Sequence, residues 1–237
     1  MSEVLLPEDY ACRLRRTGYR LGEPFGYEVA GYFNTEQDIL DWYDQTALGP
    51  KPKLGDLKYK DKNGDGIVND KDMVPIGYPE IPEWTFGAGI NIQYKNLDFS
   101  MMWQGAANRS YYMTGQNITE TYNFNNWHKE AWSQERYDAG EKITYPRLDP
   151  GSSINHLPSS FWYVNGNYIR LKNMEVGYTL PKKWTKSIRA SSVRIYINGL
   201  NLLIFDRYPV KYQDPEQSSE LLYPVFKIYN MGLNISF

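Results

Sequence analysis

The sequence has few of the residues on which catalysis and metal binding through nitrogen or sulfur depend. Its 237 residues include one cysteine, Cys12, and two histidines, His128 and His156. A single cysteine excludes an intrachain disulfide. The histidines lie far apart, without cysteine or acid at ligand spacing, so we expect two loop residues. No phosphate-binding loop, dinucleotide fingerprint or nucleophile elbow is present, and we expect no catalytic residue and no enzyme activity.

Long hydrophobic runs and an excess of basic charge are also missing. No apolar run approaches the roughly 18 residues that a membrane-spanning helix needs. The net charge is −2 and no dense basic patch interleaves with aromatics, which argues against nucleic-acid binding. Residues 1–16 carry early acids and no adequate apolar stretch, unlike a secretory signal. We therefore expect a cytosolic chain or a piece of a longer one, and the rest of the sequence favours the piece.

The sequence is rich in aromatic residues and in stretches that alternate apolar with polar positions. Five stretches predict strands: 83–95, 97–105, 168–180, 192–204 and 225–237. In the first, the even positions from Trp84 to Tyr94 are apolar and the odd positions are polar or glycine. In the third stretch the phase changes, which predicts a bulge near Asn173. The facing of 192–204 stays ambiguous from the pattern alone.

Two stretches predict short helices. Residues 35–43 open with a capping-box-like pair, Thr35 and Asp38, and residues 126–138 end before Gly140. The remainder of 105–160 is polar and rich in tyrosine. Its aromatic residues fit three roles that the sequence does not separate: contact with cargo, packing of the loop, or contact with a protein partner. These residues are Tyr111, Tyr112, Trp127 and Trp132.

Residues 61–72, DKNGDGIVNDKD, have the spacing of a calcium-binding loop. Oxygen donors at positions 1, 3, 5, 7 and 12, with glycine at position 6, predict one structural Ca²⁺. Its ligands are expected to be Asp61, Asn63, Asp65, the Ile67 carbonyl and Asp72. Prolines and glycines on both sides exclude the flanking helices of an EF-hand. The alternative is a metal-free turn in which Asp and Asn side chains accept hydrogen bonds from their own backbone.

Two architectures fit five alternating strands. One is a soluble β-sandwich, which would make the chain a calcium-binding carbohydrate-binding module or a glycoside hydrolase. The other is an antiparallel transmembrane β-barrel segment, with apolar residues facing lipid. Short connections at 95–98 and 181–191 alternate with long ones at 105–160 and 205–222, as is typical of outer-membrane barrels. Residues 230–237, NMGLNISF, resemble the terminal signal for barrel insertion, with Asn230, Gly232, Ile235 and Phe237 as its residues.

The order of several segments resembles the C-terminal part of SusC/RagA-type TonB-dependent outer-membrane transporters of Bacteroidota. The resemblance covers about residues 15–237. It rests on the segment 15–39, the Asp/Asn-rich segment 55–77, the strand pair 86–109, YPRL at 145–148, and the stretches 161–181 and 193–205 before the terminal strand. It implies that residues 1–82 form an extracellular loop region with a short helix and the calcium-type loop. Residues 83–237 would be barrel strands with long loops.

The resemblance also implies a parent protein and partners. The parent would be a plugged barrel of 22 strands in the outer membrane, which imports oligosaccharides or peptides together with a SusD-like surface lipoprotein. It would contact TonB through an N-terminal part that this sequence does not contain. About five strands cannot close around a lumen, so we expect that the chain alone cannot transport.

Overall fold

The computed structural model describes residues 18–113, 126–149, 154–209, 214–217 and 225–237, and the segment 1–16 discussed above lies outside these ranges. The chain divides into two units. The loop unit consists of Met1–Ile81 and Arg109–Asn165, and the sheet unit of Pro82–Asn108 and Gly166–Phe237. Most of the predicted loop 105–160 is therefore packed with residues that precede the strands. Within the described ranges, no helix has the length and apolarity needed to cross a membrane.

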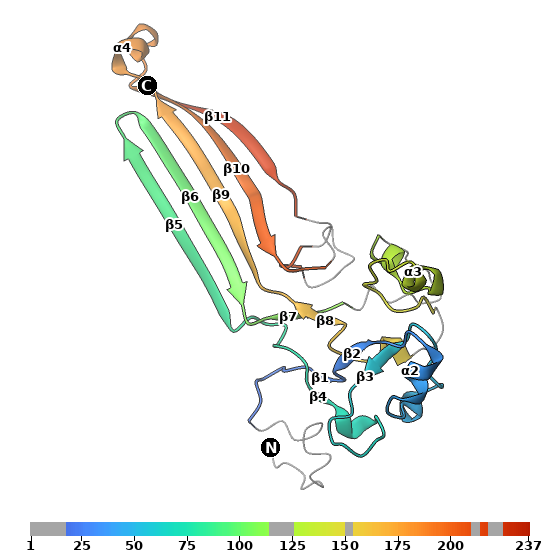
Figure 1. Ribbon diagram of the computed structural model, residues 1–237. Coiled ribbons are helices and arrows are strands. Elements are labelled where there is room, and N and C mark those ends of the chain that lie inside the picture. The colour runs from blue at the N-terminus through green and yellow to red at the C-terminus, as the bar shows by residue number, and fades with distance from the viewer. Residues whose placement is uncertain (1–17, 114–125, 150–153, 210–213, 218–224) are drawn as a thin grey trace. The chain divides into compact units, whose positions relative to one another are not determined.

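The sheet unit is one antiparallel sheet of five long strands (Figure 1). Its strands are β5 (Trp84–Tyr94), β6 (Leu97–Ala107), β9 (Tyr168–Thr179), β10 (Ser192–Asp206) and β11 (Ile228–Ser236). The spatial order is β11-β10-β9-β6-β5, so β5 and β11 are the two edges. All five predicted strands are confirmed. β5 and β6 pair from Trp84↔Ala107 to Tyr94↔Leu97, around a two-residue turn in which Lys95 has φ 53°.

A bulge in β9 is the irregularity that the phase change predicted. Met102 pairs with Asn173 and the next residue, Trp103, pairs with Leu171, so Lys172 is the extra residue of β9. Opposite it, β10 shifts register between Leu200 and Leu203, where Asn201 has φ 53°. One extra residue changes the phase of β9, whereas β10 has two extra residues relative to β6 at this level and keeps its phase, so Ile197 and Leu203 stay on the same face of the sheet. This settles the facing of β10.

The two ends of the sheet differ in the length of their connections. At one end lie the β5–β6 turn and the connection from β9 to β10, which contains α4 (Lys182–Thr185) and the 3₁₀ turn η7 (Lys186–Ile188). We call this end the turn end. From the opposite end the chain leaves in long connections, to the loop unit and between β10 and β11.

The loop unit is built from three two-stranded pairs and short helical turns. β1 (Phe25–Gly26) pairs with β4 (Val74–Pro75), β2 (Val29–Tyr32) with β3 (Leu57–Tyr59), and β7 (Ser110–Tyr112) with β8 (Tyr163–Asn165). The helical segments are α2 (Glu36–Leu40), η2 (Thr46–Leu48), η3 (Asp70–Asp72), η5 (Trp127–Glu130), α3 (Gln134–Asp138) and η6 (Ile154–His156). The core consists of Tyr27, Leu57, Tyr59, Val68 and Ile154.

One predicted helix is confirmed and the other is wrong as a continuous element. α2 begins after Thr35, whose side chain accepts from the Asp38 amide, and it is shorter than the predicted 35–43. Residues 126–138 form η5 and α3 instead of one helix. Between them Ala131 is extended, and the Trp132 amide donates to the Tyr145 carbonyl (2.8 Å). Hydrogen bonding to a segment farther along the chain therefore interrupts the helix that the local sequence favours.

Candidate functional site

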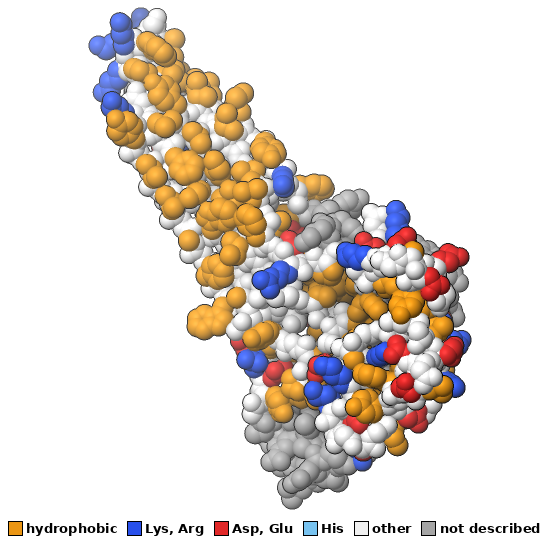
Figure 2. Space-filling model, in the orientation of Figure 1, with side chains coloured by type: hydrophobic (Ala, Val, Ile, Leu, Met, Phe, Trp, Pro, Cys, Tyr) orange, Lys and Arg blue, Asp and Glu red, His pale blue; other side chains and the backbone are white. Residues whose placement is uncertain are grey.

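One face of the five-stranded sheet is apolar from edge to edge. Residues paired across the strands lie on the same face, because side chains alternate along each strand. The face carries Trp84, Phe86, Ile90, Ile92, Leu97, Phe99, Met101, Trp103, Ile169, Met174, Val176, Tyr178, Ile195, Ile197, Leu203, Phe205, Tyr229, Met231, Leu233 and Ile235. Figure 2 shows hydrophobic side chains covering the sheet face in view.

The apolar face is open to solvent. Trp84 is 66% exposed, Ile92 55% and Met231 78%, and no second sheet covers the face in the part of the chain that the structure describes. Trp84, Phe86, Ile90, Ile92, Leu97, Phe99 and Met101 of β5 and β6 share this face, and Asn91 and Gln93 lie on the other. Soluble proteins rarely expose an apolar patch of this extent. The open face does not fit a β-sandwich, which would bury it.

The opposite face is polar and internally paired. Arg194 of β10 donates from Nη2 to Glu175 of β9 (2.7 Å) and from Nε to Asp98 of β6 (3.0 Å). Asn198 donates to Glu175 (3.3 Å) and accepts from Asn230 of β11 (2.9 Å). Each charge has an opposite charge within hydrogen-bonding distance, so the polar side chains link four neighbouring strands.

The four residues of the expected insertion signal lie on or directly after β11. Ile235 is on the apolar face, and Phe237 is 87% exposed at the end of the strand. Asn230 and Gly232 are on the polar face. A Cβ at Gly232 would lie 2.3 Å from the ring of Tyr196, so a larger residue there would require that ring to shift. The structure thus gives Gly232 a packing role beside any role in recognition.

The Asp/Asn loop 61–72 is closed by its own hydrogen bonds. Asp61 accepts from the amides of Gly64 (2.7 Å) and Gly66 (2.8 Å). Asp65 accepts from the Ile67 amide (2.9 Å), and Asn63 accepts from the Asp65 amide (2.9 Å). Gly66 has φ 85°, which glycine adopts without strain. Desolvation opposes these amide bonds, but together they hold the pKa of Asp61 below its ordinary value, so its carboxylate is charged at neutral pH.

Asp72 joins the two ends of this loop. It is fully buried, and one carboxylate oxygen accepts from the amides of Lys62 (2.8 Å) and Asn63 (3.2 Å). The other oxygen accepts from the Asn69 amide (2.8 Å), which completes a capping box at η3. Three backbone donors therefore use most of the acceptor capacity of Asp72.

The five predicted ligands are of the chemical type that binds calcium, but their side chains are not arranged around a common point for a metal. All five would donate oxygen, which Ca²⁺ prefers. In the structure, however, the side-chain oxygens of Asp61, Asn63, Asp65 and Asp72 accept backbone amides. Among the described residues no three acidic, histidine or cysteine side chains form a group that could hold a metal. Calcium binding by this loop stays a prediction.

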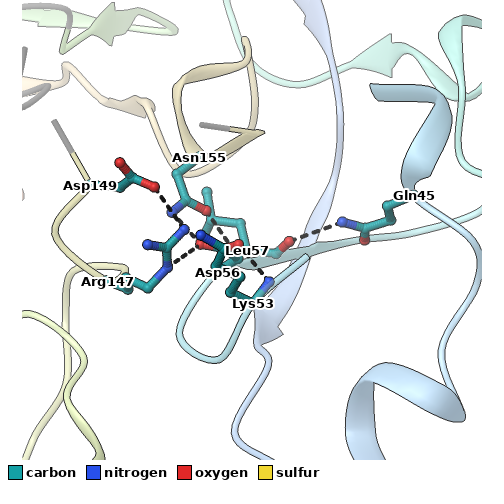
Figure 3. Close-up of polar contacts among 7 residues, drawn as sticks. All are labelled: Gln45, Lys53, Asp56, Leu57, Arg147, Asp149 and Asn155. Atoms are coloured by element: carbon teal, nitrogen blue, oxygen red, sulfur yellow. Dashed lines mark hydrogen bonds and ion pairs between the residues drawn. The ribbon is translucent and has the colours of Figure 1, made fainter. Parts of the chain in front are cut away.

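A buried polar network in the loop unit joins two of the segments on which the family resemblance rests (Figure 3). Arg147, from YPRL, donates from Nε to Asp56 (2.8 Å) and from Nη2 to Asp149 (2.8 Å). Asp56, which precedes β3, is 2% exposed and also accepts from Asn155 Nδ2 (2.9 Å) and the Lys53 amide (2.8 Å). Asn155 in turn accepts from the Leu57 amide (2.8 Å).

The charged residues of this network hold distant segments of the loop unit together. The sequence alone did not identify them as important. Burial lowers the pKa of Arg147, but the carboxylates of Asp56 and Asp149 outweigh burial and raise that pKa above its usual value. The guanidinium therefore stays charged whenever the unit is folded. The sequence offered one signal for this network: YPRL and the segment 55–77 are both part of the family resemblance. Nothing in the sequence indicated that these two segments contact each other.

The aromatic residues of 105–160 pack within the loop unit. Tyr111 and Trp132 are buried, Tyr112 stacks on Tyr163 at 4.7 Å, and Trp127 stacks on Phe161 at 5.5 Å. Of the three roles that the sequence left open, loop packing is the one with contacts in the structure. His128 is buried edge-on against Tyr145. His156 is half-buried, and burial lowers its pKa although Asp149 opposes this.

Known proteins with similar sequences are TonB-dependent receptors. TonB-dependent receptor P26 of Formosa agariphila is 28% identical over 228 residues, which cover 90% of this chain and 22% of the receptor. TonB-dependent receptor P3 of the same organism is 28% identical over 95% of this chain and 23% of its own length. TonB-dependent receptor SusC of Bacteroides thetaiotaomicron is 25% identical over 76% of this chain and 17% of its own length. The chain thus spans less than a quarter of these relatives. No family model matches it.

Solved structures show the same fold. The RagAB peptide importer in its closed-closed state matches with a TM-score of 0.66 at 19% identity, over 99% of this chain and 25% of that one. Its open-open state matches with a TM-score of 0.62 at 20% identity. The relatives with similar sequences are thus TonB-dependent receptors and the solved structures with the same fold are peptide importers, and the expectation that the chain is not an enzyme is confirmed by these relatives. More closely, the chain is related to SusC/RagA-type TonB-dependent transporters, as its motifs indicated.

The buried network generates a stability prediction. Arg147→Met should destabilise the loop unit by about 2–3 kcal/mol, because it leaves the buried Asp56 carboxylate without its counter-charge. Hydrogen exchange of the Leu57 and Arg147 backbone amides should accelerate roughly 100-fold. Arg136→Met, which removes only an ion pair to the exposed Glu141, is the matched control and should change exchange little. Equal protection in the two variants would contradict the role given to Arg147.

Proposed function

We propose that this chain is part of the wall of a TonB-dependent nutrient importer in the cell outer membrane. It would supply about five C-terminal strands of a large plugged barrel, of 22 strands by resemblance to the SusC/RagA family. The observation that carries the proposal is the continuous apolar face of the sheet, which is exposed across all five strands. In a bilayer that face meets hydrocarbon instead of water, and the cost of exposing it disappears.

The dimensions and connections of the sheet support this setting. A tilted transmembrane strand needs about 9–11 residues, and β5, β6 and β11 have 11, 11 and 9. Short connections gather at the turn end and long ones at the opposite end. Outer-membrane barrels keep short turns on the periplasmic side. We accordingly place the turn end in the periplasm and the loop unit outside the cell.

Both edges of the sheet require partners from outside this chain. β5 and β11 each pair with one neighbour only among the described residues. Unpaired amide and carbonyl groups at an open edge are too costly in hydrocarbon. The chain would therefore close its barrel with further strands of a parent protein and would not transport alone.

The relatives suggest the cargo and the partners of the parent protein, as chemical classes and types of partner. The solved structures with the same fold are named as a peptide importer, and the resemblance to the SusC/RagA family implies oligosaccharides or peptides, so these two classes are the candidate substrates. The polar face with Arg194 and Glu175 would line the interior of the barrel. A SusD-like surface lipoprotein would cover the outer side, and TonB would act through the parent's N-terminal part. Nucleic acid is not among the proposed partners.

The membrane setting predicts opposite outcomes for neighbouring residues near the centre of β5. Ile90→Arg should cost about 2–4 kcal/mol, since it places a charge in hydrocarbon, while Asn91→Arg should cost little because it faces the polar interior. Urea unfolding of the full parent protein in lipid vesicles measures both. Equal costs for the two variants, or a larger cost for Asn91→Arg, would contradict the assignment of the faces.

We propose that Asn230, Gly232, Ile235 and Phe237 act as the barrel-insertion signal. The exposed aromatic ring directly after an edge strand supports this role. In the full parent protein, deleting Phe237 should lower the outer-membrane level and leave protein in the periplasm. Replacing Phe237 with Tyr keeps an aromatic end and serves as the control. Equal outer-membrane levels of wild type and deletion, with normal heat-modifiable mobility, would show that the terminal ring is not recognised.

We propose that the loop 61–72 binds one Ca²⁺ through Asp61, Asn63, Asp65, the Ile67 carbonyl and Asp72. The spacing of the donors and the left-handed Gly66 support it, although binding requires some backbone bonds to be exchanged for metal ligation. Titration calorimetry should detect one site that Asp65→Asn weakens, while Asp70→Asn, which changes a carboxylate outside the ligand set, preserves it. No heat in millimolar calcium, with protein whose loop unit is folded, would favour the metal-free turn.

A further inference from the structure

The turn end of the sheet concentrates positive charge. Lys95 lies in the β5–β6 turn, and Lys182, Lys183, Lys186 and Arg189 lie in the β9–β10 connection; all five are exposed. Figure 2 shows Lys and Arg side chains gathered at this tip. The sequence contains no acidic residue between Glu175 and Asp206. We call these five residues the cationic tip.

The charge of the cationic tip is not neutralised within the described chain. None of its five residues forms an ion pair with another described residue. Lys95 lies over the ring of Tyr94 at 5.2 Å. The nearest carboxylate in sequence on β6, Asp98, is already paired with Arg194. An opposite charge for the tip must therefore come from another molecule or from counter-ions.

The same connection exposes large apolar side chains while its backbone is fixed. Trp184 is 62% exposed and Ile188 54%. The buried Thr185 and Ala190 anchor the segment, with the Ala190 amide donating to the Thr185 carbonyl (3.2 Å). An exposed tryptophan among lysines and arginines, beside an apolar surface, is the composition of segments that lie at the headgroup level of a membrane.

We propose that the cationic tip binds anionic phospholipid headgroups of the membrane leaflet at the turn end, with Trp184 inserted among them. The inference rests on the proposed function, which brings the apolar face into a bilayer. Lys95 follows directly on the last residue of β5, and Lys182 lies three residues beyond β9, at most about 10 Å along the chain. That distance is close to a Debye length at physiological salt, so the charges act on phosphates at the membrane surface.

Lipid titration of the detergent-extracted full parent protein tests the proposal. We compare wild type with a variant carrying Lys182→Gln, Lys183→Gln, Lys186→Gln and Arg189→Gln. A charge-matched control carries Lys51→Gln, Lys53→Gln, Lys129→Gln and Lys142→Gln in the loop unit. Bound phosphatidylglycerol and phosphatidylcholine are counted by native mass spectrometry. Each cation near an anionic surface contributes roughly five-fold to affinity, so the tip variant, which lacks four cations, should bind phosphatidylglycerol about 600-fold more weakly, with the control unchanged.

Three outcomes would overturn the proposal: equal phosphatidylglycerol binding by wild type and tip variant, equal wild-type affinity for the two lipids, or competition by inorganic phosphate at the same concentration as lipid. If the tip variant does not fold, the wild type decides alone, because its preference for phosphatidylglycerol must weaken steeply as salt rises. If the true ligand is an acidic soluble protein, the cationic tip should bind it in a salt-dependent manner and should show no preference for phosphatidylglycerol over phosphatidylcholine, which would also overturn the proposal. Failure of the Ile90→Arg test would instead refute the membrane setting, and the two failures are therefore distinguishable.

Discussion

The register that keeps apolar side chains on one face of the sheet is the constraint on which the rest of the sheet unit depends. A slip by one residue in any strand would move its apolar set to the polar side. β9 and β10 both depart from regular pairing at the same level, at Lys172 and between Leu200 and Leu203. The one extra residue of β9 matches the change of phase in its sequence, and the two extra residues of β10 relative to β6 leave its phase unchanged, so the apolar face continues across the bulge. Without the bulge at Lys172, Ile169 would lie among polar neighbours, and a one-residue bulge in β10 would have done the same to Phe205.

Charge pairing on the polar face complements this register. Arg194 holds Asp98 and Glu175 from two different strands, and only one alignment of β6, β9 and β10 brings the three groups together. Thus hydrophobicity selects which face each strand presents, and the ion pairs select the level at which the strands align.

Much of the sheet unit could be predicted because its signals are local. Alternation from Trp84 to Tyr94 specifies a strand within eleven residues, and the change of phase around Asn173 specifies the bulge. The loop unit depends on distant partners. Asp56 meets Arg147 and Asn155 at separations of 91 and 99 residues, which no local pattern encodes. The predicted helix 126–138 failed for the same reason, since Ala131 and Trp132 pair with the distant Tyr145.

The Asp/Asn loop shows why ligand spacing alone does not decide between a metal and a turn. Side-chain oxygens that can surround a cation can equally accept backbone amides, and both arrangements need the left-handed glycine. Here Asp72 satisfies three amides and closes the loop from within, while Asp61 and Asp65 each accept amides at the rim. A loop already closed loses little conformational entropy when a ligand binds. Calcium would then have to compete mainly with hydrogen bonds, and Asp72, buried and bonded to three amides, is the ligand for which that competition is hardest.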